Sequence, residues 1–203
     1  MTAPAASSQA RGASGGVPRV EVSWAGRASP PPPGGTPGST GPEERLAVAL
    51  ERFGCQVLWR LRRPLEVSVL LCDEATMRDL NARYRGIEAP TDVLSFGQFE
   101  ALPRDPSSGH WSAPSAQVAG DVVIAVDVAV RQATLRGEPL ERELCRLLVH
   151  GMLHLVGMDH ADPPAEDEPM LTLQERMLAD LRSDVDRLRH VLPQVVLPEV
   201  VEE

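Results

Sequence analysis

The chain has 203 residues, a length that suits one domain and is too short for two ordinary ones. Hydrophobic residues make up 42% of it, so the chain can bury a core, and a wholly disordered protein is excluded. The net charge of −9 excludes a protein that is basic over its whole surface, and no apolar run is long enough to span a membrane.

The N-terminal segment is rich in proline, glycine and serine. This composition predicts a disordered tail over 1–16 and a flexible linker over 28–41. Between them, apolar and polar residues alternate over 20–24, which is the two-residue period of a strand. We therefore expect a single domain over 17–190, followed by an acidic tail over 191–203.

The first half of the folded part predicts a helix followed by alternating strands and helices. A helix is expected to begin at Pro42, since proline suits the first helical turn, and to end at Gly54. Alternating apolar residues over 65–72 predict a strand, and Asp73 can cap the helix that follows it. Residues 91–96 predict a second strand, at an edge of the sheet because a proline precedes it.

The second half opens with a long loop, predicted over 97–119 from its proline, serine and glycine content. A strand over 122–126 then leads into a helix that Asp127 is expected to cap. Pro139 opens a helix that is apolar on nearly all sides and therefore central, and one last helix is expected over 168–188. This order of elements predicts an α+β or α/β fold with a small mixed sheet packed against helices.

The most informative pattern is a cluster of three histidines in the central helix and just after it. Residues four apart lie on one face of a helix, so His150 and His154 project together. Gly157 can end the helix in a left-handed conformation, after which the chain can return His160 to the same point. Three imidazoles leave one position of a tetrahedral Zn²⁺ open, which is typical of a catalytic site. We therefore predict one zinc ion per chain, bound by His150, His154 and His160.

The same histidine spacing occurs in the metzincin peptidases, where a glutamate directly follows the first histidine and acts as the general base. In this chain the residue at that position is Gly151, which carries no proton acceptor. The pattern therefore supports a zinc hydrolase and speaks against a peptidase of that kind.

Four motifs together resemble the YbeY family of bacterial endoribonucleases, in the family order over about residues 43–180. The motifs are Tyr-Arg-Gly at 84–86, Thr-Asp-Val-Leu-Ser-Phe at 91–96, Gly-Asp-Val-Val-Ile at 120–124 and the histidine block at 150–160. The resemblance implies a single-strand-specific, zinc-dependent endoribonuclease that acts in 3′-end maturation of small-subunit (16S) rRNA and in ribosome quality control. It also implies an α+β fold with a four-stranded sheet, in which residues 20–24 form the first strand.

The resemblance implies that Arg85, the arginine of the first motif, is catalytic together with His150. A planar guanidinium can stabilise the negative charge that builds on phosphate oxygens during phosphodiester cleavage. Judged from the residues alone, Arg85 is either such a group or an exposed arginine that closes a helix. The implied partners are single-stranded RNA, an rRNA precursor, and the ribosome or its small subunit with assembly factors. No membrane partner is expected.

For several polar residues the sequence allows either a role at the site or a purely structural role. Asp159 either accepts a hydrogen bond from a ligand histidine or caps the turn before His160. A group of arginines either follows an RNA backbone or forms a solvated turn, and polar residues of the second strand either line the cleft or pack that strand. These residues are Arg60, Arg62, Arg63, Thr91, Asp92 and Ser95.

Two other functions stay open beside the endoribonuclease. One is a zinc hydrolase that acts on another class of substrate. The other is a non-catalytic, zinc-containing ribosome-assembly factor, in which an acidic residue from the C-terminal part fills the fourth zinc position. Residues 161–203 hold 11 acidic residues against 4 arginines, whereas residues 1–160 hold 18 against 16, so the main part can still present a local basic cleft.

The cysteines and the N-terminus favour a cytoplasmic protein. Cys55, Cys72 and Cys145 stand far apart and form no paired framework, which is typical of buried, reduced thiols. The first residues lack the apolar stretch of a secretory signal, so we expect a cytoplasmic location.

Overall fold

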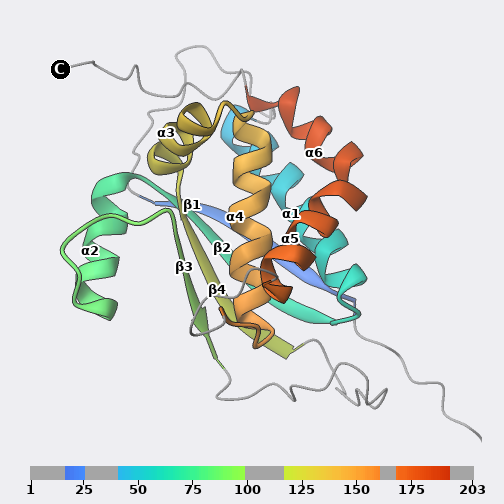
Figure 1. The fold of residues 1–203 in the computed structure, drawn as a ribbon, viewed down its shortest axis with the longest axis horizontal. Helices are drawn as coiled ribbons and strands as arrows, with labels where there is room; N and C mark the ends of the chain where they lie inside the picture. Colours follow the sequence, from blue (N-terminus) through green and yellow to red (C-terminus); the bar gives the residue numbers. More distant parts are fainter. Residues whose placement is uncertain (1–16, 26–40, 99–116, 161–167, 193–203) are drawn as a thin grey trace, which may run out of the picture.

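A mixed sheet and the helices around it are built from residues 17–25, 41–98, 117–160 and 168–192, which are the residues that this computed structural model describes. In chain order the elements are β1 (Arg19–Ala25), α1 (Pro42–Arg60), β2 (Leu65–Cys72), α2 (Glu74–Arg85), β3 (Val93–Gly97), β4 (Gln117–Ala125), α3 (Val126–Arg136), α4 (Leu140–Leu155), α5 (Pro169–Asp180) and α6 (Arg182–Arg189). Figure 1 shows them as one α+β domain, as the sequence predicts.

The four strands lie in the order β1-β2-β4-β3. β1, β2 and β4 are parallel to one another, whereas β3 runs antiparallel to β4 and forms one edge of the sheet. The register places Val22 opposite Val69, Val69 opposite Val122, and Val122 opposite Ser95. The predicted first strand and the predicted edge strand are both confirmed.

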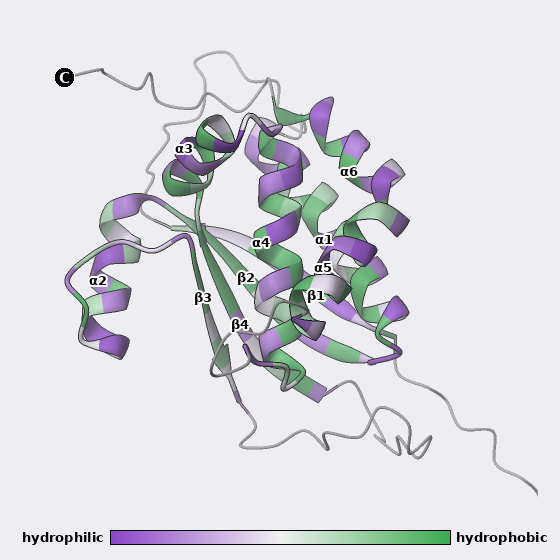
Figure 2. Cartoon of the chain, viewed as in Figure 1, coloured by the Kyte–Doolittle hydropathy of each residue, from purple (hydrophilic) through white to green (hydrophobic). Residues whose placement is uncertain are grey.

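The two faces of the sheet are covered by different helices. Residues of β2 and β4, including Val69 and Val122, pack into the main core with α1, α4, α5 and α6. A second, smaller core on β3 and β4 contains Leu94 and Val123 together with Met77 of α2. Figure 2 shows hydrophobic residues concentrated on the strands and on the sides of the helices that face them. The alternation of apolar side chains along each strand therefore fixes which helices cover which face.

The central position predicted for the helix after Pro139 is confirmed. Helix α4 contacts β3 and β4 as well as α1, α3, α5 and α6. Its side chains Leu144, Leu148 and Met152 are fully buried. Because its apolar residues anchor it on several sides, α4 is a rigid support for the polar residues that it carries.

The end predicted for the first helix at Gly54 is wrong, since α1 continues to Arg60. A Cβ atom at Gly54 would lie 2.8 Å from Cε of Met152 and 3.0 Å from Cγ2 of Val20. The glycine therefore allows α1 to approach α4 and β1 closely and does not stop the helix.

Three further boundaries differ from the prediction. β4 begins at Gln117, so the strand takes up the end of the predicted loop 97–119. α3 begins at Val126, so Ala125 stands at the N-cap and the predicted cap Asp127 lies inside the first turn. The carboxylate of Asp127 accepts a hydrogen bond from the backbone N–H of Glu74 at 3.3 Å. The last predicted helix is divided at Leu181, whose ψ of 19° departs from helical geometry while its side chain stays buried.

Parts of the predicted organisation lie outside the described residues. These are the tail 1–16, the linker 28–41 up to residue 40, residues 99–116 of the predicted loop, and residues 193–203 of the acidic tail. Within the described part of the chain, no helix has the length and apolarity needed to cross a membrane.

Candidate metal centre

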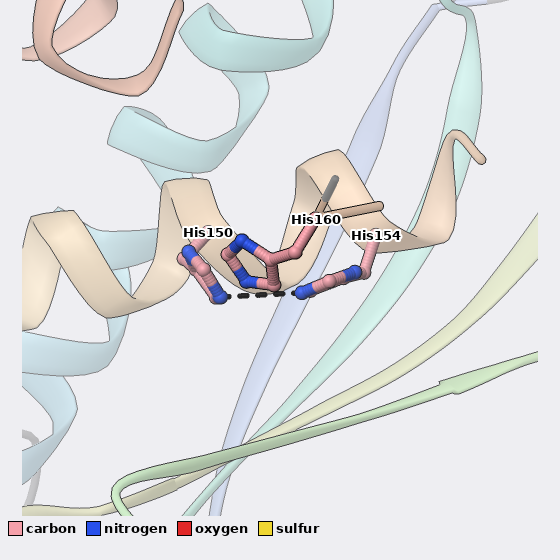
Figure 3. A group of neighbouring side chains, drawn as sticks. All are labelled: His150, His154 and His160. Atoms are coloured by element: carbon pink, nitrogen blue, oxygen red, sulfur yellow. Dashed lines mark hydrogen bonds between the residues drawn. The ribbon is translucent and has the colours of Figure 1, made fainter. Parts of the chain in front are cut away.

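The end of α4 brings three histidines together. His150 and His154 lie one turn apart on the same face of the helix, as their spacing predicts. Gly157 then adopts a left-handed φ of 86° and ends the helix. The backbone N–H groups of Gly157 and Met158 donate hydrogen bonds to the carbonyl oxygens of His154 and Leu153. The chain reverses there and returns His160, so that one ring nitrogen from each of the three histidines lies within 4.8 Å of the others (Figure 3).

The hydrogen bonds of His150 and His154 fix which ring nitrogen is protonated. Nδ1 of His150 lies 3.0 Å from Oε1 of Gln174, whose own amide nitrogen donates to Glu175 at 3.2 Å. Nδ1 of His154 lies 3.1 Å from the carbonyl oxygen of Met158, which can only accept. Both Nδ1 atoms therefore donate, and in the neutral rings both Nε2 atoms carry lone pairs.

Those two lone-pair nitrogens face one another at 3.2 Å, the contact drawn as a dashed line in Figure 3. Two acceptors at this distance repel each other unless a cation lies between them. Tetrahedral zinc with Zn–N bonds of about 2.0–2.1 Å holds its nitrogen ligands roughly 3.3–3.4 Å apart. The donor set therefore fits a zinc-sized divalent cation.

Burial keeps the two helical histidines in the form that binds metals. It lowers the pKa of both His150 and His154 below that of a free imidazole, and the neighbouring His150 lowers the pKa of His154 further. Neutral imidazoles with an available lone pair are the form that ligates metal ions.

His160 is held by a residue that sequence reasoning missed. Its Nδ1 pairs with the carboxylate of Glu168, the residue that precedes α5, and the Glu168 side chain is only 10% exposed. This pairing leaves Nε2 of His160 for a metal, and a carboxylate on the far nitrogen raises the basicity of a ligand histidine. From the sequence, Glu168 is predicted only to begin the last helix, and no local pattern links it to His160.

Gln174 was missed as well, although a signal for it is present. Its side chain is 3% exposed and lies among the apolar positions of α5, between Met170 and Met177. A polar side chain at a buried helix position needs a hydrogen-bond partner, so its place in the apolar stripe is the signal that points to it. The partner, His150, lies 24 residues away and is visible only in the fold.

Asp159 caps the turn, which decides between its two interpretations. Its Oδ1 accepts a hydrogen bond from the backbone N–H of His160 at 2.8 Å. The same oxygen lies 3.8 Å from Nδ1 of His154, which is too far for a hydrogen bond. The nearer acceptor for His154 is the Met158 carbonyl.

The position directly after His150 faces the sheet and not the histidine cluster. A Cβ atom at Gly151 would lie 2.6 Å from Cγ1 of Val122, and the Gly151 carbonyl accepts a hydrogen bond from Ser95 at 3.3 Å. A glutamate here would clash with β4. The packing thus gives a physical reason for the absence of the peptidase general base.

Arg85 is the last residue of α2 and is followed by the left-handed Gly86, as its place before a glycine predicts. Its side chain is exposed, and it forms no hydrogen bond or ion pair with another residue in the described part of the chain. The structure therefore does not bring Arg85 into direct contact with the three histidines. In Figure 1 the C-terminal ends of α2 and α4 both point to the lower side of the view, with β3 between them.

The other polar candidates mostly stabilise the fold. Arg60 donates to the backbone carbonyl of Asp180 at 3.3 Å and ties α1 to α5. Asp92 accepts hydrogen bonds from the backbone N–H of Val93 at 2.8 Å and from Gln132 of α3 at 3.1 Å, so it anchors the start of β3. Of the polar residues in and before β3, Ser95 is the one bonded to α4, next to His150.

Comparison with known proteins identifies the family. The family model for Endoribonuclease YbeY matches residues 44–182, a span that contains the three histidines and Arg85. Endoribonuclease YbeY of Heliobacterium modesticaldum is 43% identical over 140 residues, which cover 67% of this chain and 83% of that protein. Endoribonuclease YbeY of Thermobifida fusca is 44% identical over 144 residues, which cover 71% of this chain and 88% of that protein. The chain therefore belongs to the YbeY family of endoribonucleases.

Proposed function

We propose that this protein is a zinc-dependent endoribonuclease that cleaves single-stranded RNA. Its proposed role is 3′-end maturation of 16S rRNA and ribosome quality control, in the cytoplasm, with the small ribosomal subunit and its assembly factors as partners. One observation supports the zinc-dependent catalysis. The lone-pair nitrogens of His150 and His154 lie 3.2 Å apart, and a ring nitrogen of His160 lies in the same group. Family membership supports the RNA substrate.

Each of the three proposed ligands is oriented by a partner on its far nitrogen. Gln174 holds His150, the Met158 carbonyl holds His154, and Glu168 holds His160. These partners keep each Nε2 directed toward a common point and restrict rotation of the rings. A zinc ion held there would lower the pKa of its bound water toward neutrality and so supply a nucleophile at physiological pH.

Arg85 is proposed to stabilise the phosphate during cleavage. Negative charge builds on the non-bridging oxygens as the nucleophile attacks, and a guanidinium can donate two parallel hydrogen bonds to them. Arg85 is exposed and forms no ion pair with an acidic residue of the described part of the chain, which supports this role.

A non-catalytic zinc protein is the second candidate, and the cluster argues against it. Structural zinc sites use four protein ligands. Among the described residues, the group that can hold a metal contains the three histidines without a fourth histidine, cysteine, aspartate or glutamate. Glu168, the acidic side chain bonded to the group, uses its carboxylate on Nδ1 of His160. Three ligands without a fourth among the described residues favour a catalytic site.

We also propose that residues 17–190 act as one catalytic domain, for whose fold 1–16 and the linker 28–41 are dispensable. The predicted acidic tail begins too early at 191, because Leu192 is buried in the main core with Val191 packed against it. A protein that lacks 1–16, and one with a shortened 28–41, are expected to retain the zinc content and the cleavage rate of the full chain. Loss of folding in either protein would contradict this domain assignment.

Cleavage by matched histidine variants tests the proposed function. The metal-loaded full chain is expected to cleave a single-stranded RNA that contains the 3′ end of a 16S rRNA precursor and to leave the same sequence intact in a duplex. His154→Ala removes a proposed ligand and should abolish cleavage, whereas His190→Ala removes an exposed histidine at the end of α6 and should not. Equal cleavage by both variants would contradict the proposal.

A further inference from the structure

The C-terminal end of α2 presents an exposed aromatic ring beside two arginines. Tyr84, the sole tyrosine of the chain, is 57% exposed, and Ile87 in the following loop is 52% exposed. The Arg83 guanidinium lies 5.5 Å from the centroid of the Tyr84 ring, and Arg85 is exposed on the other side of Tyr84 in the sequence. We call Arg83, Tyr84, Arg85 and Ile87 the α2 patch. In a protein with a net charge of −9, this local pairing of basic and aromatic side chains needs an explanation.

The α2 patch is held in place by its surroundings. The Tyr84 ring packs edge-on against Phe96 of β3, with centroids 5.0 Å apart and an angle of 63° between the ring planes. The loop after α2 is fixed by Asn81, which is 4% exposed and donates from Nδ2 to the carbonyl of Ala89 at 2.7 Å. An exposed ring that is already ordered loses little conformational entropy when a ligand stacks on it.

β3 connects the α2 patch to the histidine cluster. Phe96, which contacts Tyr84, follows Ser95, and the Ser95 hydroxyl donates to the carbonyl of Gly151 at 3.3 Å. Gly151 directly follows the proposed ligand His150. The patch and the cluster therefore lie on two sides of one short edge strand, so a flexible polyanion that passes this edge can contact both (Figure 1).

We infer that the α2 patch is a base-stacking site for single-stranded RNA, with Tyr84 as the stacking ring and Arg83 and Arg85 as contacts to the flanking phosphates. The inference rests on the proposed function, to which it adds a binding site. Proteins bind single strands by stacking successive bases on aromatic rings and by following the backbone with cations. The bases of a duplex are not free to splay out in this way, so the α2 patch would contribute to a preference for single strands.

Binding of a fluorescent, unstructured oligoadenylate to the metal-loaded full chain, followed by anisotropy, tests this inference. Phosphorothioate linkages keep the charge of the oligoadenylate backbone and slow its hydrolysis during the titration. A gel after each titration verifies that the RNA stays intact. Tyr84→Leu should weaken binding roughly 5- to 150-fold, the factor that corresponds to the loss of one stacked base. Tyr84→Phe keeps the ring and should restore most of the affinity. Arg83→Ala should lower the slope of log affinity against log salt by about 0.7, the value for one phosphate contact on a single strand.

Trp59→Leu is the matched control, because Trp59 is also 57% exposed but lies at the end of α1. It should bind the oligoadenylate as the parent protein does. An oligomer of abasic nucleotides should bind the parent and Tyr84→Leu equally, because it has no bases to stack. Unchanged affinity of Tyr84→Leu for oligoadenylate, or an equal loss in Tyr84→Leu and Trp59→Leu, would overturn the inference. Melting temperature and zinc content show that each variant is folded and loaded.

Failure of this inference is distinguishable from failure of the proposed function. Anisotropy reports binding whether or not the RNA is cut. If the parent protein cleaves RNA and Tyr84→Leu binds oligoadenylate as tightly as the parent, the proposed function stands and the stacking site is overturned. If Tyr84→Leu loses affinity but the parent never cleaves RNA, the stacking site stands and the proposed function is overturned.

Discussion

Replacement of Gln174 by leucine removes the acceptor that holds the His150 ring, with a side chain of similar size. Gln174 is 3% exposed, and its Oε1 lies 3.0 Å from Nδ1 of His150. Without this acceptor a buried N–H loses its partner, which costs about 1–3 kcal/mol of folding stability in the metal-free protein. The proton of His150 is then also free to move to Nε2, where it competes with a metal.

Loss of such an outer partner typically weakens metal binding roughly 10- to 100-fold, or about 1.4–2.7 kcal/mol. Gln174→Glu keeps an acceptor on Nδ1 and should retain most of the affinity. Competition with a chromophoric zinc chelator measures the affinity, and thermal melting with and without zinc measures the stability. An unchanged zinc affinity of folded Gln174→Leu would refute the claim that Gln174 orients a metal ligand.

The remaining predictions concern the other side chains at or near the cluster. Glu168→Gln should weaken zinc binding by about tenfold in the same chelator competition, because a neutral amide supports His160 less than a carboxylate does; unchanged binding would remove Glu168 from the site. Gly151→Ala should destabilise the protein, since overpacking against Val122 costs about 1–3 kcal/mol and the better helix propensity of alanine returns at most about 1 kcal/mol. A thermal melt at or above that of the parent protein would contradict this packing. Arg85→Lys should slow single-turnover RNA cleavage about a hundredfold at unchanged zinc content, because lysine keeps the charge but loses the planar fork. Parent-like cleavage would exclude Arg85 from the active site.

The features that the sequence predicts well are those set by local spacing. The shared face of His150 and His154 follows from their four-residue spacing in a helix. The return of His160 follows from the left-handed Gly157 between the helix and His160. The strands at 20–24 and 65–72 follow from alternation along the chain. Each of these rests on residues that are neighbours in sequence.

The features that sequence reasoning missed depend on contacts between distant segments. Gly54 has the form of a helix stop but serves a close approach between α1 and Met152, almost a hundred residues further along the chain. Asp127 suits a cap for its own helix, yet its carboxylate is used by the backbone of Glu74. Gln174 and Glu168 support histidines that lie on another element. No local pattern contains such pairings, because they arise only when the helices pack.

Zinc content of purified full-length protein, determined by elemental analysis, tests the central claim most directly. The parent protein and His190→Ala are both expected to hold about one zinc ion per chain, because His190 lies outside the cluster. The triple variant with alanine at His150, His154 and His160 is expected to hold none while it keeps its fold, judged by circular dichroism. Retention of zinc by the folded triple variant would contradict the assignment of the three histidines as the metal ligands.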